Sequence, residues 1–350
     1  GAEAEPCSFE IRLSSDTTQA IPEEGLKYNM GDKAGTLQVV CTSETKPTTL
    51  KYKWRKASTQ EGALGSAGST SQTKKETYKP AVAKGINWYA CDVTYTVDGQ
   101  SYTVTTARVK VTVDVTQEYV NKKKPVINEQ PAGGSWKYGS EEAILTAEIA
   151  GTEEVTITWY ISSDEGSTWQ ETSSGDYSGK IQVLGPMLFL QELPVGEYQF
   201  KYIVTYSEEN LAGETLSVST ESEIAAVTIE LQEGIWEGEG IETSPYLIKN
   251  KDDLKKLSDL ASQSSFKDKY FKFADEIDGE KGISLPENWK PIGTKDKPFA
   301  GTIDGNNKKL VVPKGEKALI GVPFGASLKN LSIYGEEIKG NGVVNNYSLT

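Results

Sequence analysis

The chain has 350 residues, more than one ordinary domain, and its 17 Tyr and 7 Trp are typical of a folded, β-rich protein of two or three domains. It contains no His, which excludes Ser-His-Asp and Cys-His nucleophiles and every His-ligated metal site, and its three Cys are too few for a four-thiolate zinc site. The net charge is −13, and residues 125–230 hold 3 Lys and Arg against 18 Asp and Glu, which argues against nucleic acid and anionic lipid as partners.

Two polar joints divide the chain. "NKKKP" (121–125) ends in proline, and in "IELQEGIWEGEG" (229–240) a strand-like run gives way to Gly and Glu. These joints predict domains at 1–121, 125–230 and 236–350, each of a usual domain size.

The first segment consists of short runs in which apolar and polar residues alternate, as a β-sandwich requires. The last of these runs, at 86–113, reads as a long hairpin that turns at Asp98-Gly99, a strong signal for a two-residue hairpin loop. The earlier expected strands lie at 8–13, 37–42 and 50–56.

Two spacings in this segment form a recognisable pattern. Trp54 follows Cys41 by thirteen residues, and Tyr89 stands two residues before Cys91. The pattern resembles that of immunoglobulin domains. The resemblance implies a Cys41–Cys91 disulfide between strands B and F, with Trp54 packed on it and Tyr89 at the tyrosine-corner position; two unrelated free cysteines are the alternative.

A disulfide requires an oxidising compartment, so the chain is expected to be exported and extracellular, attached to the cell surface. Cys7 is left over, as a free thiol, in an intermolecular bridge, or with its partner cysteine lost by trimming of the chain. No apolar run is long enough to span a membrane, and membrane insertion is not expected.

The second segment repeats this plan without cysteines and resembles the tandem Ig-like domains of bacterial surface proteins. The resemblance places Trp159 in the core, Tyr198 at the tyrosine corner and Phe200 where the second cysteine would stand. Within it, "SSDEGSTW" (162–169) fits the Asp-box pattern of sialidases and related glycosidases. Because the chain has one such box and only three Arg, we interpret it as a hairpin turn, with Asp164 accepting backbone amides.

The third segment opens with a helix. Asn250 is expected to cap it, with Leu254, Leu257 and Ala261 forming one apolar stripe. Short apolar clusters separated by Gly and Asn follow, as in a parallel β-helix.

Residues 244–335 resemble bacterial surface β-helix modules of the GLUG type, most specifically in the F-x-G-T-x-D-G-N run from Phe299 to Asn306. The resemblance implies a right-handed β-helix whose first rung is capped by the helix. Lys308 and Val311 depart from the family pattern, and the natural protein is expected to continue beyond Thr350 or to end in a self-capping tail. The bore is expected to be filled by Phe299, Ile303, Leu310, Val312, Leu319, Leu328, Leu331 and Ile333. The expected fold class is therefore all-β: two immunoglobulin-like β-sandwiches followed by a short parallel β-helix with an N-terminal capping α-helix.

Two kinds of side chain are candidates for a site. Asp275, Asp278 and Glu280 lie together in "ADEIDGEK" and are candidate calcium ligands, a solvated turn being the alternative. Trp88 and Trp136 are candidate ligand-binding aromatics, with packing at a sandwich edge as the alternative. Trp88 is out of phase with Tyr89 and Cys91 along its strand, so its side chain is expected to face outward.

The sequence contains many carboxylates, but no two of them stand out as the acid and the base or nucleophile that a glycosidase holds at a defined separation. No enzyme activity is therefore expected. The function expected is a non-catalytic extracellular surface module of a larger exported bacterial protein, a monomer that binds a host glycan or surface protein. Two alternatives stay open: an accessory region of a surface peptidase or glycoside hydrolase whose catalytic domain lies outside this chain, and a carbohydrate-active enzyme.

Overall fold

The computed structural model describes residues 4–62, 75–315 and 318–335. The chain is all-β, with short helices, and none of the described helices is long and apolar enough to cross a membrane. It forms two compact units, the first built from Gly1–Ile127, Ile149–Thr156 and Ile203–Thr220, and the second from the remaining residues. The boundary between the units runs through the segment 125–230, so the three-domain division stays a prediction.

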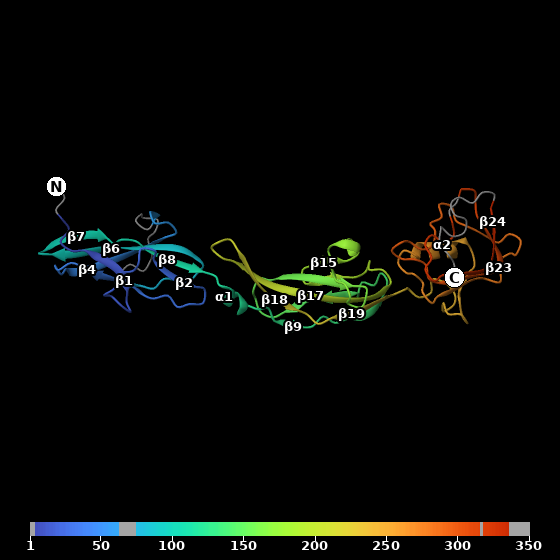
Figure 1. Cartoon of the computed structure of the whole chain (residues 1–350), viewed down its shortest axis with the longest axis horizontal. Helices are drawn as coiled ribbons and strands as arrows, with labels where there is room; N and C mark the ends of the chain where they lie inside the picture. Colours follow the sequence, from blue (N-terminus) through green and yellow to red (C-terminus); the bar gives the residue numbers. More distant parts are fainter. Residues whose placement is uncertain (1–3, 63–74, 316–317, 336–350) are drawn as a thin grey trace. The chain divides into compact units, whose positions relative to one another are not determined.

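The N-terminal segment, blue to cyan in Figure 1, is a sandwich of two sheets. The smaller sheet has the order β1-β3-β5, with β1 at Phe9–Leu13, β3 at Leu37–Cys41 and β5 at Thr77–Tyr78. The larger sheet has the order β2-β8-β6-β4, with β7 also paired to β6; its strands are β2 at Leu26–Asn29, β8 at Val109–Asp114, β6 at Gly85–Val97, β4 at Thr48–Ala57 and β7 at Gln100–Thr105. Strand β2 runs parallel to β8, and every other described pairing in the two sheets is antiparallel.

Alternation along the strands builds the core of this sandwich. Along β6, Tyr89, Cys91, Val93 and Tyr95 are all buried, and Trp54 on β4 lies directly opposite Cys91. The hairpin between β6 and β7 turns where the sequence predicts. Asp98 and Gly99 both have positive φ, 48° and 78°, as a two-residue primed turn requires.

Helix α1 (Gln117–Asn121) lies at the first predicted joint, and the Thr116 side chain caps it by accepting a hydrogen bond from the Tyr119 N–H. Val115 and Val120 form a small buried cluster with Tyr206 in the same compact unit.

The middle segment also forms two main sheets. One has the order β10-β19-β17-β13-β14 with β18 paired to β17, and the other has the order β11-β16-β15. A short pair, β9 and β12, and the 3-10 helix η3 complete the segment. The bounds are β9 Ile127–Glu129, β10 Gly134–Lys137, β11 Ile144–Thr146, β12 Glu148–Ile149, β13 Thr156–Ser162, β14 Gln170–Glu171, η3 Gly175–Tyr177, β15 Gln182–Leu184, β16 Met187–Phe189, β17 Gly196–Glu209, β18 Thr215–Glu221 and β19 Ala225–Glu230.

The C-terminal segment, yellow to red in Figure 1, differs in the direction of its strands, which all pair in parallel. Their order is β20-β21-β23-β22, with β24 paired to β23. The bounds are β20 Tyr246–Ile248, β21 Tyr270–Phe273, β22 Ile283–Ser284, β23 Thr302–Val311 and β24 Ser327–Tyr334. The predicted apolar residues share one core: Phe299, Ile303, Leu310, Val312 and Leu319 are buried, and Leu328, Leu331 and Ile333 pack against them.

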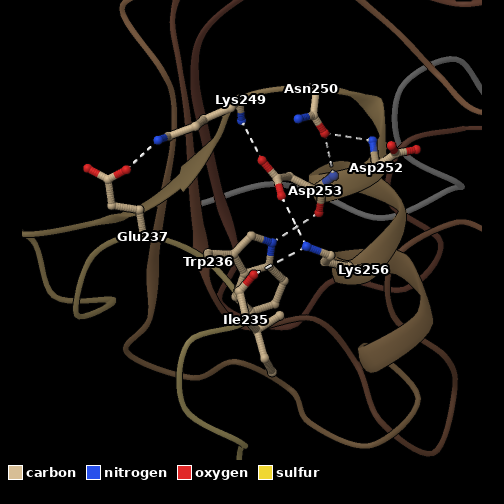
Figure 2. Close-up of polar contacts among 8 residues, drawn as sticks. All are labelled: Ile235, Trp236, Glu237, Lys249, Asn250, Asp252, Asp253 and Lys256. Carbon is tan, nitrogen blue, oxygen red and sulfur yellow. Dashed lines mark hydrogen bonds and ion pairs between the residues drawn. The ribbon is translucent and has the colours of Figure 1, made fainter.

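Helix α2 (Lys251–Leu260) begins as the sequence predicts. The Asn250 side chain accepts hydrogen bonds from the N–H groups of Asp252 and Asp253, both at 3.0 Å (Figure 2). Leu254 and Leu257 are fully buried, so the helix contributes its apolar stripe to the core of the parallel strands.

Trp236, from the second predicted joint, also belongs to this core. Its indole Nε1–H donates a 3.0 Å hydrogen bond to the Asp253 carbonyl (Figure 2). Its ring also contacts that of Phe271, with 5.1 Å between the centroids. The joint thus ends in a residue that is buried in the C-terminal segment.

Candidate ligand-binding face of the first sandwich

The outer face of the larger N-terminal sheet is set by strand register. On β6, Tyr89 and Cys91 point into the core, so Trp88 points outward as predicted. Trp88 lies opposite Ala57 of β4 on one side and Lys110 of β8 on the other. We call the outward-facing group Arg55, Ala57, Trp88, Asp92 and Lys110 the Trp88 face.

Trp88 is partly exposed at the centre of this face. The Lys110 Nζ lies 5.7 Å from the centroid of the indole ring, within range of a cation–π contact. Ile86, two residues earlier on the same side of β6, is 38% exposed. An aromatic surface, an apolar side chain and a cation are thus adjacent on one strand pair.

Arg55 and Asp92 hold one end of the face rigid. The Arg55 guanidinium donates to the Asp92 carboxylate from Nε at 3.0 Å and from Nη2 at 2.6 Å, and the Thr105 hydroxyl donates to it at 2.8 Å. Burial alone would raise the pKa of the Asp92 carboxyl, but these hydrogen bonds and the Arg55 charge outweigh burial and lower the pKa. Asp92 is therefore ionised at neutral pH and is already engaged.

The face carries more positive than negative charge. Asp114, the other acid on this side, accepts the N–H groups of Val115 and Leu211. The cations that register places on the same side are Lys27, Lys51, Lys53, Arg55 and Lys110. A positive potential of this kind attracts anionic ligands.

The second aromatic candidate, Trp136, has a different setting. It lies on β10 opposite the buried Ile229, is half-buried, and folds across Gly134, where a side-chain Cβ would come within 2.9 Å of the indole. Trp88 and Trp136 belong to different compact units, and each is described within its own unit.

Two acids of "ADEIDGEK", Asp275 and Asp278, accept hydrogen bonds within the protein. The Asp278 carboxylate accepts the N–H groups of Lys281 and Glu280, both at 2.8 Å, and these bonds lower the pKa of the Asp278 carboxyl. Asp275 accepts the Asn306 amide at 2.7 Å, and the Lys308 Nζ donates to the backbone carbonyls of Asp275 and Ile277. Within the described residues no group of three or more acidic or Cys side chains is placed to hold a metal ion, so the proposed Asp275, Asp278 and Glu280 calcium site lacks support.

The predicted Cys41–Cys91 disulfide is not formed in this structure, where both residues are free thiols. The reason lies in the direction of the Cys41 side chain at the end of β3. Its Sγ lies 3.3 Å from the Ser43 hydroxyl and 3.6 Å from the Thr45 carbonyl, toward the turn that follows. Cys91 is buried beside Trp54, and its Sγ contacts the Asp92 carbonyl.

The residues predicted to form the two cores are all buried: Trp54, Tyr89, Trp159, Tyr198 and Phe200. Only one of the two predicted tyrosine corners forms. The Tyr198 hydroxyl donates a 2.9 Å hydrogen bond to the Pro194 carbonyl, four residues upstream, whereas the Tyr89 hydroxyl has no hydrogen-bond partner in the described part of the chain. Burial raises the pKa of Tyr89 to about 12 and that of Tyr198 further.

The Asp-box is a closed turn rather than a site. Asp164 accepts from the Thr168 hydroxyl at 2.6 Å, from the Thr168 N–H at 2.8 Å and from the Ser162 hydroxyl at 2.7 Å. These bonds, the Thr168 hydroxyl first, lower the pKa of the Asp164 carboxyl to about 2. Gly166 has φ of 86°, as expected, and the Trp169 ring lies 4.4 Å from the Nζ of Lys201.

The sequence alone did not identify Lys110 and Asp92 as parts of the face. Alternation gives the outward direction of Lys51, Lys53 and Arg55 on β4, but their neighbours on β6 and β8 follow from cross-strand register.

No known protein family and no curated protein sequence matches the chain. Solved structures that match include extracellular domains 3–5 of Drosophila OTK, with 14% identity, a TM-score of 0.21 and 59% of each chain covered. Others are three N-terminal domains of the bacteriophage RB49 outer capsid protein Hoc (12% identity, TM-score 0.24, 65% of this chain and 71% of that chain) and the tandem Ig repeats of Dlar (12%, 0.23, 64% and 100%). Structural similarity at these TM-scores does not indicate a function for this chain.

Proposed function

We propose that the chain is a non-catalytic extracellular module of a larger exported bacterial surface protein, and that its Trp88 face binds an anionic host glycan. The observation that carries this proposal is the register of β6 with β8, which places the partly exposed Trp88 beside Lys110 on the outward face of the sheet. An aromatic face packs on the apolar side of a sugar ring, and a neighbouring cation pairs with its carboxylate or sulfate.

Rigidity favours this face over the other aromatic positions. Trp88 stands within a 13-residue strand that is paired on both sides, and the Arg55–Asp92 ion pair fixes the next positions along it. A preorganised surface loses little conformational entropy when a ligand binds. Lys201 lies closer to the Trp169 ring, at 4.4 Å from the centroid, than Lys110 lies to the Trp88 ring, at 5.7 Å, and Trp136 folds onto Gly134.

We infer that the C-terminal segment is a short parallel β-helix of the GLUG type and serves as a scaffold. The parallel pairing of its described strands and their single apolar core support this inference. The buried Leu254 and Leu257 support a capping role for α2. Its Asp278 carboxylate accepts turn N–H groups and its Asp275 carboxylate accepts the Asn306 amide, which favours a non-catalytic role.

A binding array of anionic glycans, neutral glycans and host extracellular proteins tests the proposal. The intact chain is expected to bind carboxylated or sulfated glycans, and both Trp88→Ala and Lys110→Ala are expected to lose that binding. Lys122→Ala is the matched control, because it removes one exposed cation at the C-cap of α1 and leaves the face unchanged. Retained glycan binding by Trp88→Ala would contradict the proposal. Loss of glycan binding in Trp136→Ala, with binding retained in Trp88→Ala, would assign the site to the second sandwich.

A further inference from the structure

Two of the three thiols meet at one backbone carbonyl. The Cys7 Sγ lies 3.3 Å from the Thr45 carbonyl oxygen, and the Cys41 Sγ lies 3.6 Å from the same oxygen. The two sulfur atoms are therefore within about 7 Å of each other, the sum of these distances. Neither sulfur has a comparable contact with Cys91 among the described residues.

Strand register explains why these thiols converge. Phe9 of β1 lies opposite Cys41 of β3, and the ladder continues one step further, where the Thr42 N–H donates to the Ser8 carbonyl at 2.9 Å. Cys7 therefore shares a face with Phe9 and Cys41 and is the diagonal neighbour of Cys41. Diagonal neighbours in an antiparallel pair lie about 7–8 Å apart at Cα, slightly beyond the 4.4–6.8 Å usual for a disulfide.

A small movement of Cys7 closes this gap. Cys7 lies two residues before β1, so it can approach β3 without breaking any of the residue pairs between β1 and β3. It is held near its place by a hydrogen bond from its N–H to the Tyr95 hydroxyl at 3.2 Å, and it is 3% exposed. Its position is thus defined and close to the geometry of a bridge.

We propose that Cys7 and Cys41 form the disulfide of this domain when the chain meets a low-molecular-weight disulfide such as oxidised glutathione. The partly exposed Cys41 thiolate attacks one sulfur of glutathione disulfide, which releases one glutathione thiolate and leaves a mixed disulfide on Cys41. The Cys7 thiolate then attacks the Cys41 Sγ and releases the second glutathione. In sum, two protein thiols are oxidised to one disulfide while one glutathione disulfide is reduced to two glutathione thiols.

Cys91 is a poor competitor for this bond. It is fully buried beside Trp54, and burial raises the pKa of its thiol to about 12. The thiolate is the reacting form, so a thiol with such a pKa attacks slowly at neutral pH. The Cys7–Cys41 bond would covalently link the segment just before β1, an edge strand, to the inner strand β3.

Disulfide mapping tests the proposal on the full chain. The chain is equilibrated with a glutathione redox buffer, free thiols are alkylated, and the protein is digested with trypsin without reduction. Cleavage after Lys and Arg places Cys7 in residues 1–12, Cys41 in 34–51 and Cys91 in 85–108, because the Lys46-Pro47 bond resists trypsin. The expected cross-linked species joins 1–12 to 34–51, with residues 85–108 alkylated.

Cysteine variants provide the control. Cys91→Ala is expected to lose two hydrogens on oxidation as the native chain does, whereas Cys7→Ser is expected to lose none. A cross-link between 34–51 and 85–108 would overturn the proposal, as would a stable glutathione adduct on Cys41 with no internal bond. Because the mapping uses the native chain, the result does not depend on the folding of any variant.

Discussion

At the residue scale, Asp164 shows how a motif associated with glycosidases is used here as structure. Its carboxylate accepts two hydroxyl groups and the Thr168 N–H, so all of its contacts lie within the turn. The pKa of the folded carboxyl, about 2, is lower than the 3.8 of an unperturbed Asp. Because the folded pKa is depressed, the turn is stabilised fully above about pH 4, and this stabilisation is lost as the pH falls through 2.

An NMR pH titration of the Asp164 carboxyl checks this account. The midpoint is expected at about 2, and Thr168→Val, which removes the hydroxyl donor at 2.6 Å, is expected to move it up toward 3.8. A native midpoint near 3.8 would show that the turn is open in solution.

The two sandwiches differ at their tyrosine corners, and this difference predicts unequal effects of two similar substitutions. Tyr198→Phe leaves the Pro194 carbonyl without its donor, which is expected to lower the free energy of unfolding by about 1–3 kcal/mol. Tyr89→Phe removes a hydroxyl without a partner in the described residues and is expected to cost less. Urea denaturation of both variants measures the difference; equal losses would argue against the Tyr198–Pro194 bond.

At the scale of elements, the start of α2 depends on one side chain. Asn250 satisfies two N–H groups of the first turn, and Asp253 in turn accepts the Lys249 N–H at 3.0 Å (Figure 2). Asn250→Ala is expected to lower the free energy of unfolding of the C-terminal segment by about 0.5–2 kcal/mol, as is typical of lost N-caps. Asn250→Ser, which keeps an acceptor, is the matched control and is expected to recover most of the loss. An unchanged urea midpoint in the Ala variant would show that the cap contributes little.

Structural features that depend only on residues close together along the chain could be predicted from the sequence. The turn at Asp98-Gly99 follows from residues that tolerate positive φ, and the start of α2 follows from Asn250 and the two acids after it. The outward direction of Trp88 follows from simple alternation.

Features that depend on contacts between distant residues could not be predicted in this way. The Arg55–Asp92 pair joins residues 37 apart, and its existence depends on the register of β4 with β6. Spacing also says nothing about the direction of the Cys41 side chain, which is turned toward Ser43 and Thr45 and forms no bond with Cys91 in this structure.

At the scale of the whole molecule, charge separates the proposed binding face from the rest of the chain. The net charge is −13, yet Lys27, Lys51, Lys53 and Lys110 lie on one side of the sheet that carries Trp88. An anionic glycan bound there interacts with exposed cations, so its affinity is expected to fall as salt is added.

The most direct test is a titration calorimetry measurement of the strongest anionic glycan from the array against the native chain and Trp88→Ala, at low and high salt. We expect Trp88→Ala to raise the Kd at least about tenfold, a loss of about 1.4 kcal/mol, and the native Kd to rise with salt. An unchanged Kd in Trp88→Ala, with the chain folded by circular dichroism, would contradict the assignment of the binding face.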